Sequence, residues 1–108
     1  MDKDIVRLKK ILREINILEE ITNGVKREDF LSNIEKQNAV SMILLKIGEF
    51  TKGLSESLRK SNSEIPFRMM AGLRDNVAHE YDKLDFDAIW DTVMIDIPRL
   101  KLKIAKLV

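Results

Sequence analysis

The sequence predicts an all-α fold: an up-and-down bundle of four main helices, with room for a short fifth, in one domain over residues 1–108. Apolar residues recur at steps of three and four along most of the chain, which is the spacing of an amphipathic helix. Only two prolines and four glycines are available to interrupt helices. No segment alternates apolar and polar residues as a strand would, and this length leaves no room for a second core.

The first helix is predicted by an apolar stripe at one face of the N-terminal segment, formed by Ile5, Leu8, Leu12, Ile15, Leu18 and Ile21. We expect it to end at Thr22-Asn23-Gly24, because glycine readily takes the left-handed conformation that follows many helices. Residues 26–32 form a polar connector or a short helical turn that holds Phe30. Ser32 or Asn33 is then placed to cap the next helix.

The second long helix is expected from about Ile34 to about Leu58, with its apolar residues on one face. Gly48 interrupts this pattern, and a glycine inside a helix costs stability relative to alanine. We therefore expect another helix to approach closely at Gly48. Residues 59–64 are polar and are expected to form a loop.

A third helix is expected from about Pro66, a residue suited to a first helical turn, to about Tyr81. Residues 82–85 form a short turn, and Asp85 is a good N-cap for the last helix. That helix carries an apolar stripe over residues 86–104. Pro98 lies inside it and should kink or divide it, because proline lacks the N–H and its ring clashes with the preceding turn.

The composition narrows the classes of function. No cysteine is present, which excludes disulfides and thiolate metal sites and favours a cytoplasmic protein. No apolar run approaches the roughly 20 residues of a membrane helix, and the start of the chain does not resemble a signal peptide. The net charge is only +1, so any contact with nucleic acid must come from a local basic pocket. A basic C-terminal stretch (Arg99, Lys101, Lys103 and Lys106) is one candidate, but a solvated helix end favoured by the helix dipole is the better account of it.

The segment from Arg74 to Tyr81 holds the only histidine and the only tyrosine of the chain. On an ideal helix Arg74 and Tyr81 nearly align, whereas His79 lies about 140° from Arg74. Asp75 lies one turn before His79, so its carboxylate is a candidate for fixing the histidine tautomer. The arginine, histidine and tyrosine converge only if the helix frays near His79 or a second subunit closes the site. Without further information, a histidine at a helix end and a packed tyrosine are the simpler interpretation.

The string Arg74-x4-His79-x-Tyr81 resembles the signature of HEPN-domain ribonucleases, and specifically of HepT-like toxins from prokaryotic toxin–antitoxin pairs. The resemblance covers nearly the whole chain. Its further matches are Ile47-Gly48-Glu49, Ile65-Pro66-Phe67-Arg68 (phenylalanine in place of the family's tryptophan), Asp85-Phe86, Trp90 and Asp96-Ile97-Pro98-Arg99-Leu100.

The resemblance implies a HEPN-like bundle that forms a homodimer, with the motifs of two subunits around one cleft. It implies an endoribonuclease in which a ribose 2′-hydroxyl attacks the adjacent phosphodiester and leaves a cyclic phosphate, without metal or cofactor. Arg74, His79 and Tyr81 are then catalytic: the arginine stabilises charge on phosphorus, the histidine moves a proton, and the tyrosine positions the phosphate or hydroxyl. Asp75 and Asn76 are supporting residues; the family often has asparagine at position 75. A single histidine also gives no basis for a conventional metal site.

In this family the antitoxin is a small nucleotidyltransferase that transfers AMP to the motif tyrosine, which corresponds to Tyr81 here. A bulky anion at this position would block an RNA phosphate. An alternative is a non-catalytic helical accessory module that docks a nucleotidyltransferase, and a third is a structural dimer without ligand. Glu49, beside Gly48, is expected to be a partly buried carboxylate paired with Arg74 or Arg68.

Overall fold

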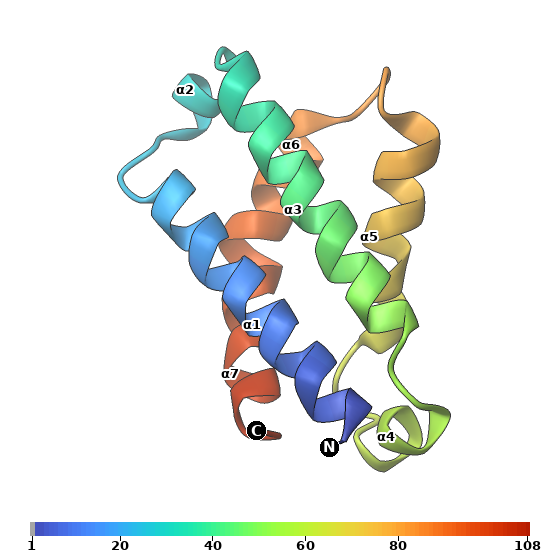
Figure 1. The fold of residues 1–108 in the computed structure, drawn as a ribbon. Helices are drawn as coiled ribbons and strands as arrows, with labels where there is room; N and C mark the ends of the chain where they lie inside the picture. Colours follow the sequence, from blue (N-terminus) through green and yellow to red (C-terminus); the bar gives the residue numbers. More distant parts are fainter. Residues whose placement is uncertain (1) are drawn as a thin grey trace.

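The computed structural model describes residues 2–108; helices joined by short connectors make up this range, which contains no β-strand. It confirms the predicted all-α class (Figure 1). The elements in chain order are α1 (Lys3–Thr22), α2 (Arg27–Leu31), α3 (Ile34–Lys52), α4 (Glu56–Ser61), α5 (Phe67–Glu80), α6 (Phe86–Asp91), the π-helical turn η1 (Thr92–Asp96) and α7 (Ile97–Ala105). None of the helices within residues 2–108 is long and apolar enough to span a bilayer.

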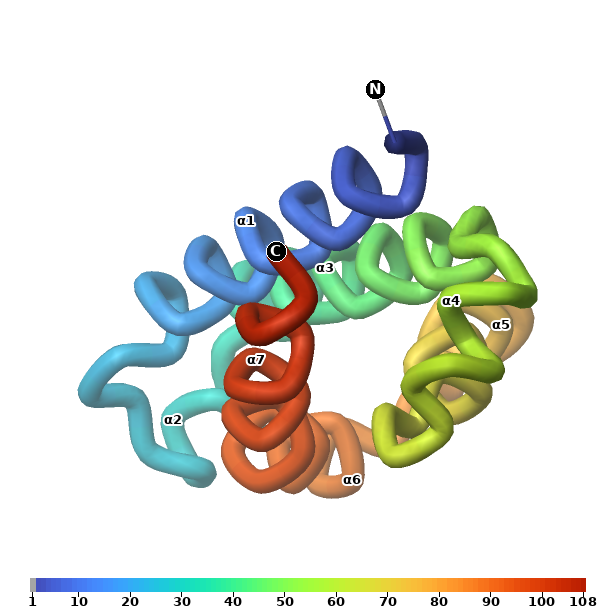
Figure 2. Tube along the Cα trace, turned by 90° about the horizontal axis from the view of Figure 1, so that it is seen from below, coloured from blue at the N-terminus to red at the C-terminus, as the bar shows by residue number. Residues whose placement is uncertain are grey.

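Four long rods run alternately up and down: α1, α3, α5, and the continuous rod of α6, η1 and α7 (Figure 1). Helix α3 is central, because it packs extensively against both α1 and α5. Seen from below in Figure 2, α7 lies across from α3, and α5 lies at one side of the bundle with α4 beside it. Helix α5 packs mainly on α3, so much of its surface faces solvent.

The core is a single cluster of buried side chains contributed by all four rods. Phe30, in the short helix α2, is fully buried and stacks on Trp90 of α6 with ring centroids 5.0 Å apart. Phe86 meets the same phenylalanine edge-on at 6.0 Å. The connector between the first two long helices is therefore the short helical turn that the sequence allowed, and its aromatic residue ties α2 to the last rod.

Several predicted helix ends are confirmed. Gly24 follows α1 with φ 74°, the left-handed conformation that favours glycine. The Asn33 side chain accepts a hydrogen bond from the Lys36 N–H at 3.0 Å, and Asp85 accepts one from the Ala88 N–H at 3.1 Å. Both α3 and α6 therefore begin at the N-cap residues that the sequence predicted.

The predicted length of the second long helix is wrong. Helix α3 ends at Lys52, and a separate helix α4 begins after Ser55, so part of the expected polar loop is helical. A Cβ at Gly53 would lie 2.4 Å from the Arg7 Nε, and the Ser55 hydroxyl caps the new helix at the Leu58 N–H. The Asp4 carboxylate accepts hydrogen bonds from both the backbone and hydroxyl of Ser55. The apolar spacing continues across this break, so periodicity alone gave no sign of it.

The last rod is continuous from Phe86 to Ala105, and Pro98 does not divide it; what changes just before Pro98 is the hydrogen-bond pattern of the helix. The turn from Thr92 to Asp96 is π-helical, and the Ile97 N–H donates to the Thr92 carbonyl five residues earlier. A wider turn before a proline relieves the clash between its ring and the preceding carbonyl, which is one of the known causes of such interruptions.

Candidate functional site

The contact between α3 and α5 fixes the position of Arg74. A Cβ built on Gly48 would lie 2.4 Å from the Arg74 backbone nitrogen and 2.6 Å from the Arg74 Cβ. No side chain fits at such distances, so the absence of one at Gly48 lets the two helix backbones meet. This confirms the expected close approach and shows that the approaching residue is the arginine of the motif.

Two carboxylates hold the Arg74 guanidinium. Its Nε lies 3.4 Å from Glu49 Oε1, and its Nη1 donates to Asp75 Oδ1 at 3.3 Å. The predicted pairing of Glu49 with Arg74 is confirmed. The expectation that Glu49 is partly buried is wrong, since 52% of its side chain is exposed at the edge of the helix pair. The Arg74 side chain is 34% exposed, so it keeps donors within reach of solvent.

Asp75 does not orient His79. Its Oδ1 accepts a short hydrogen bond from Lys52 Nζ as well as the one from Arg74. The Lys52 hydrogen bond, with a smaller contribution from Arg74, holds the pKa of the Asp75 carboxyl below its ordinary value. The predicted role in fixing the histidine tautomer is therefore wrong: the Asp75 carboxylate bonds to Lys52 of α3 and to the neighbouring Arg74 of α5 instead of to His79.

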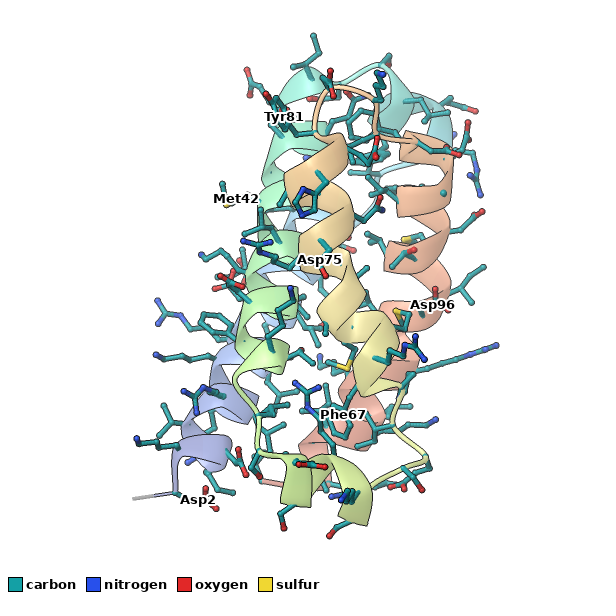
Figure 3. All side chains as sticks on the ribbon, turned by 90° about the vertical axis from the view of Figure 1, so that its right-hand side faces the viewer. Asp2, Met42, Phe67, Asp75, Tyr81 and Asp96 are labelled. Carbon is teal, nitrogen blue, oxygen red and sulfur yellow. The ribbon has the colours of Figure 1, made fainter. Side chains whose placement is uncertain are left out.

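His79 and Tyr81 lie at the C-terminal end of α5, both exposed to solvent. Helix α5 continues through Glu80, and Tyr81 still has helical φ and ψ of −57° and −25°. The helix therefore does not fray near His79. Arg74 and His79 are five positions apart, so they are separated by about 7.5 Å along the helix axis and point in different directions. Figure 3 shows Asp75 near the middle of α5 and Tyr81 at its end, so within one chain the motif is spread along the helix.

A groove of about 410 Å³ lies beside Tyr81, between α3 and α5. Its lining is mostly apolar and consists of Asn38, Ser41, Met42, Leu45, Val77, Ala78, Tyr81, Leu84 and Phe86. Met42 is 55% exposed and Tyr81 is 74% exposed. Met42 lies on α3 next to α5 in Figure 3. The groove extends the site from Tyr81 onto α3.

Asn76, a predicted supporting residue, is exposed on α5, and its side-chain amide has no hydrogen-bond partner among residues 2–108. In the same range no group of three or more histidine, aspartate or glutamate side chains gathers as a metal site would require.

The sequence reasoning missed Lys52, which lies one helical turn after Gly48. That spacing was the available signal, because residues four apart on a helix face the same neighbour.

These features define a class: small helical bundles that present an arginine–x4–histidine–x–tyrosine motif on an exposed helix. The family model described as "Ribonuclease HepT-like" matches residues 11–107, and the chain belongs to this HepT-like family. It is 40% identical over 100 residues to a Thermococcus cleftensis protein named "Probable ribonuclease HepT", covering 93% of this chain and 91% of the relative. It is 33% identical to a Caldanaerobacter subterraneus subsp. tengcongensis protein named "Putative RNase", covering 93% and 89%. No solved structure matches this chain.

Proposed function

We propose that this protein is a metal-independent endoribonuclease that uses Arg74, His79 and Tyr81. The observation that carries the proposal is that a chain of the HepT-like ribonuclease family holds this motif on one solvent-facing helix, with its arginine fixed at a glycine contact. Exposed functional groups on a rigid element are what a macromolecular substrate needs.

The chemistry follows from the side chains. The His79 imidazole removes the proton from a ribose 2′-hydroxyl, whose oxygen then attacks the adjacent phosphorus. The bond from phosphorus to the 5′-oxygen breaks, the leaving oxygen takes up a proton, and a cyclic phosphate remains. Arg74 stabilises the negative charge that develops on the phosphoryl oxygens. The Tyr81 phenol and the Asn76 amide are available to position the phosphate or the hydroxyl.

We infer that the reaction takes place between two copies of the chain. The motif residues converge in one cleft only through helix fraying or through a second subunit, and α5 is intact through Glu80. A homodimer that apposes two α5 helices would supply the histidine of one motif near the arginine of the other. The exposed Met42 and the apolar groove beside Tyr81 support this, since such surfaces are usually covered in an assembly.

We further propose that the chain is the cytoplasmic toxin of a toxin–antitoxin pair, neutralised by a nucleotidyltransferase that adenylylates Tyr81. The Tyr81 side chain is about three-quarters exposed at the end of α5, so such a partner can reach its phenol. The phosphate of an attached AMP would carry negative charge into the space that RNA must enter, and the nucleotide would fill the groove next to it.

Cleavage of total RNA in the presence of EDTA tests the proposal. Wild type is expected to cleave, whereas Arg74→Ala and His79→Ala are expected to lose activity with melting curves close to that of wild type. Arg13→Ala, at an exposed arginine on α1, is the matched control and should cleave normally. Full activity in either motif variant would refute the assignment. Inactivity of unmodified wild type on every RNA would instead favour an accessory module that docks a nucleotidyltransferase. Light scattering and intact mass on the same samples report the dimer and any AMP on Tyr81.

A further inference from the structure

Lys52 and Arg74 share one acceptor atom. Lys52 is the last residue of α3, and its ammonium group donates to Asp75 Oδ1; the Arg74 Nη1 donates to the same oxygen at 3.3 Å. Two cations bonded to one oxygen lie no more than two hydrogen-bond lengths apart, about 6 Å. The site therefore has two adjacent positive charges, one from each of the helices that meet at Gly48.

A phosphodiester can replace the Asp75 carboxylate in this arrangement, because it also has anionic oxygens that accept hydrogen bonds from an ammonium and a guanidinium. A phosphate presents oxygens that accept from both kinds of donor, and such charge-assisted bonds are the stronger class. The contacts of Arg74 to Glu49 and Asp75 involve only Nε and Nη1, so other donors of its fork remain. The side chains of Lys52 and Arg74 are 38% and 34% exposed, so an approaching strand can reach both.

Charge balance makes the second cation important. Glu49 and Asp75 together carry as much negative charge as Arg74 and Lys52 carry positive charge, and the whole chain has a net charge of only +1. Without Lys52, the motif arginine would lie between two carboxylates with a net negative local charge. An RNA phosphate would then be repelled from the place where it must bind.

We propose that Lys52 is a substrate-binding residue that contacts an RNA phosphate beside Arg74, and that Asp75 holds the Lys52 ammonium in position when no RNA is bound. This inference rests on the ribonuclease function proposed above. Lys52 also lies where a cation favours the end of a helix, a structural role that would not depend on RNA. The two roles differ in how RNA binding responds to salt.

The test measures the Kd of a single-stranded RNA oligonucleotide carrying 2′-O-methyl groups, which removes the attacking hydroxyl and so prevents cleavage. Each phosphate contact contributes about 0.7 to the slope of log Kd against log salt concentration for a single strand. Lys52→Gln is expected to weaken binding and to lower this slope by about 0.7, whereas Lys52→Arg should retain it. Lys60→Gln is the control, because it also removes the charge of a lysine paired with a carboxylate, Glu56 at 3.1 Å, but Lys60 lies on α4 and outside both the motif and the basic C-terminal stretch.

A double variant separates direct contact from mere neutralisation of Asp75. If Lys52 binds phosphate, Lys52→Gln combined with Asp75→Asn keeps the lowered slope. Recovery of the wild-type slope in the double variant would overturn the proposed contact, as would an unchanged slope in Lys52→Gln alone. Failure of wild type to bind or cleave any RNA would overturn the ribonuclease proposal itself, and the Lys52 inference with it. Melting temperatures of Lys52→Gln and wild type should differ by only a few degrees, because an exposed ion pair at a helix end contributes about 1 kcal/mol at most.

Discussion

Replacing Gly48 with alanine should destabilise the protein, although alanine is the better helix former. The added Cβ would meet the Arg74 backbone nitrogen, Cβ and Cα at 2.4, 2.6 and 2.9 Å, and two of these atoms belong to the α5 backbone. A backbone cannot rotate away as a long side chain can, so α3 and α5 must separate. Overpacking of this kind costs about 1–3 kcal/mol, and the helix propensity of alanine offsets about 1 kcal/mol. Because two of the three clashing atoms are backbone, we expect the upper end of this range at Gly48, and therefore a net loss of about 2 kcal/mol.

In a domain of about 100 residues, each 1 kcal/mol shifts the melting temperature by about 4–8 °C, so Gly48→Ala should melt about 8–16 °C below wild type. Gly72→Ala is the matched control, because Gly72 also lies inside a helix but a Cβ there meets nothing within 4 Å. That variant should melt a few degrees above wild type. Thermal unfolding followed by circular dichroism measures both. Equal or higher stability of Gly48→Ala relative to Gly72→Ala would refute the argument that the helices are in contact at Gly48.

Two further predictions concern the parts of the fold that support the site. Phe30→Ala should lower the free energy of unfolding by about 3–5 kcal/mol, because the fully buried ring packs α2 against Trp90. Urea unfolding measures this change. A loss below about 1 kcal/mol would contradict that role. Hydrogen bonds from the Ser55 hydroxyl and N–H lower the pKa of Asp4, so this carboxylate stabilises the fold fully above its ordinary pKa of 3.8, and the contribution is lost as the pH falls through the lowered value. Asp4→Asn should therefore be less stable than wild type at neutral pH, with the difference shrinking below about pH 4; a constant difference across this range would exclude ionised Asp4 as the cause.

Much of the fold could be predicted because it depends on neighbours in the chain. The apolar stripes that form α1, α3, α5 and the last rod, and the caps at Asn33 and Asp85, act over three or four residues. The end of α3 could not be predicted in this way. It depends on a segment about fifty residues earlier in the chain, from which Arg7 lies against Gly53 and Asp4 accepts hydrogen bonds from Ser55. The spacing of apolar residues carries no information about these contacts.

The sequence by itself determined that a helical bundle would carry Arg74, His79 and Tyr81 on one helix, because residue order and helical period are local properties. Only the tertiary structure decided which partners these residues have. It directed Asp75 to Lys52 instead of His79, and it set the Arg74 backbone against Gly48. Those outcomes depend on how α5 is placed on α3, and a preference for one pairing over another arises only once two segments distant in the chain are held at contact distance.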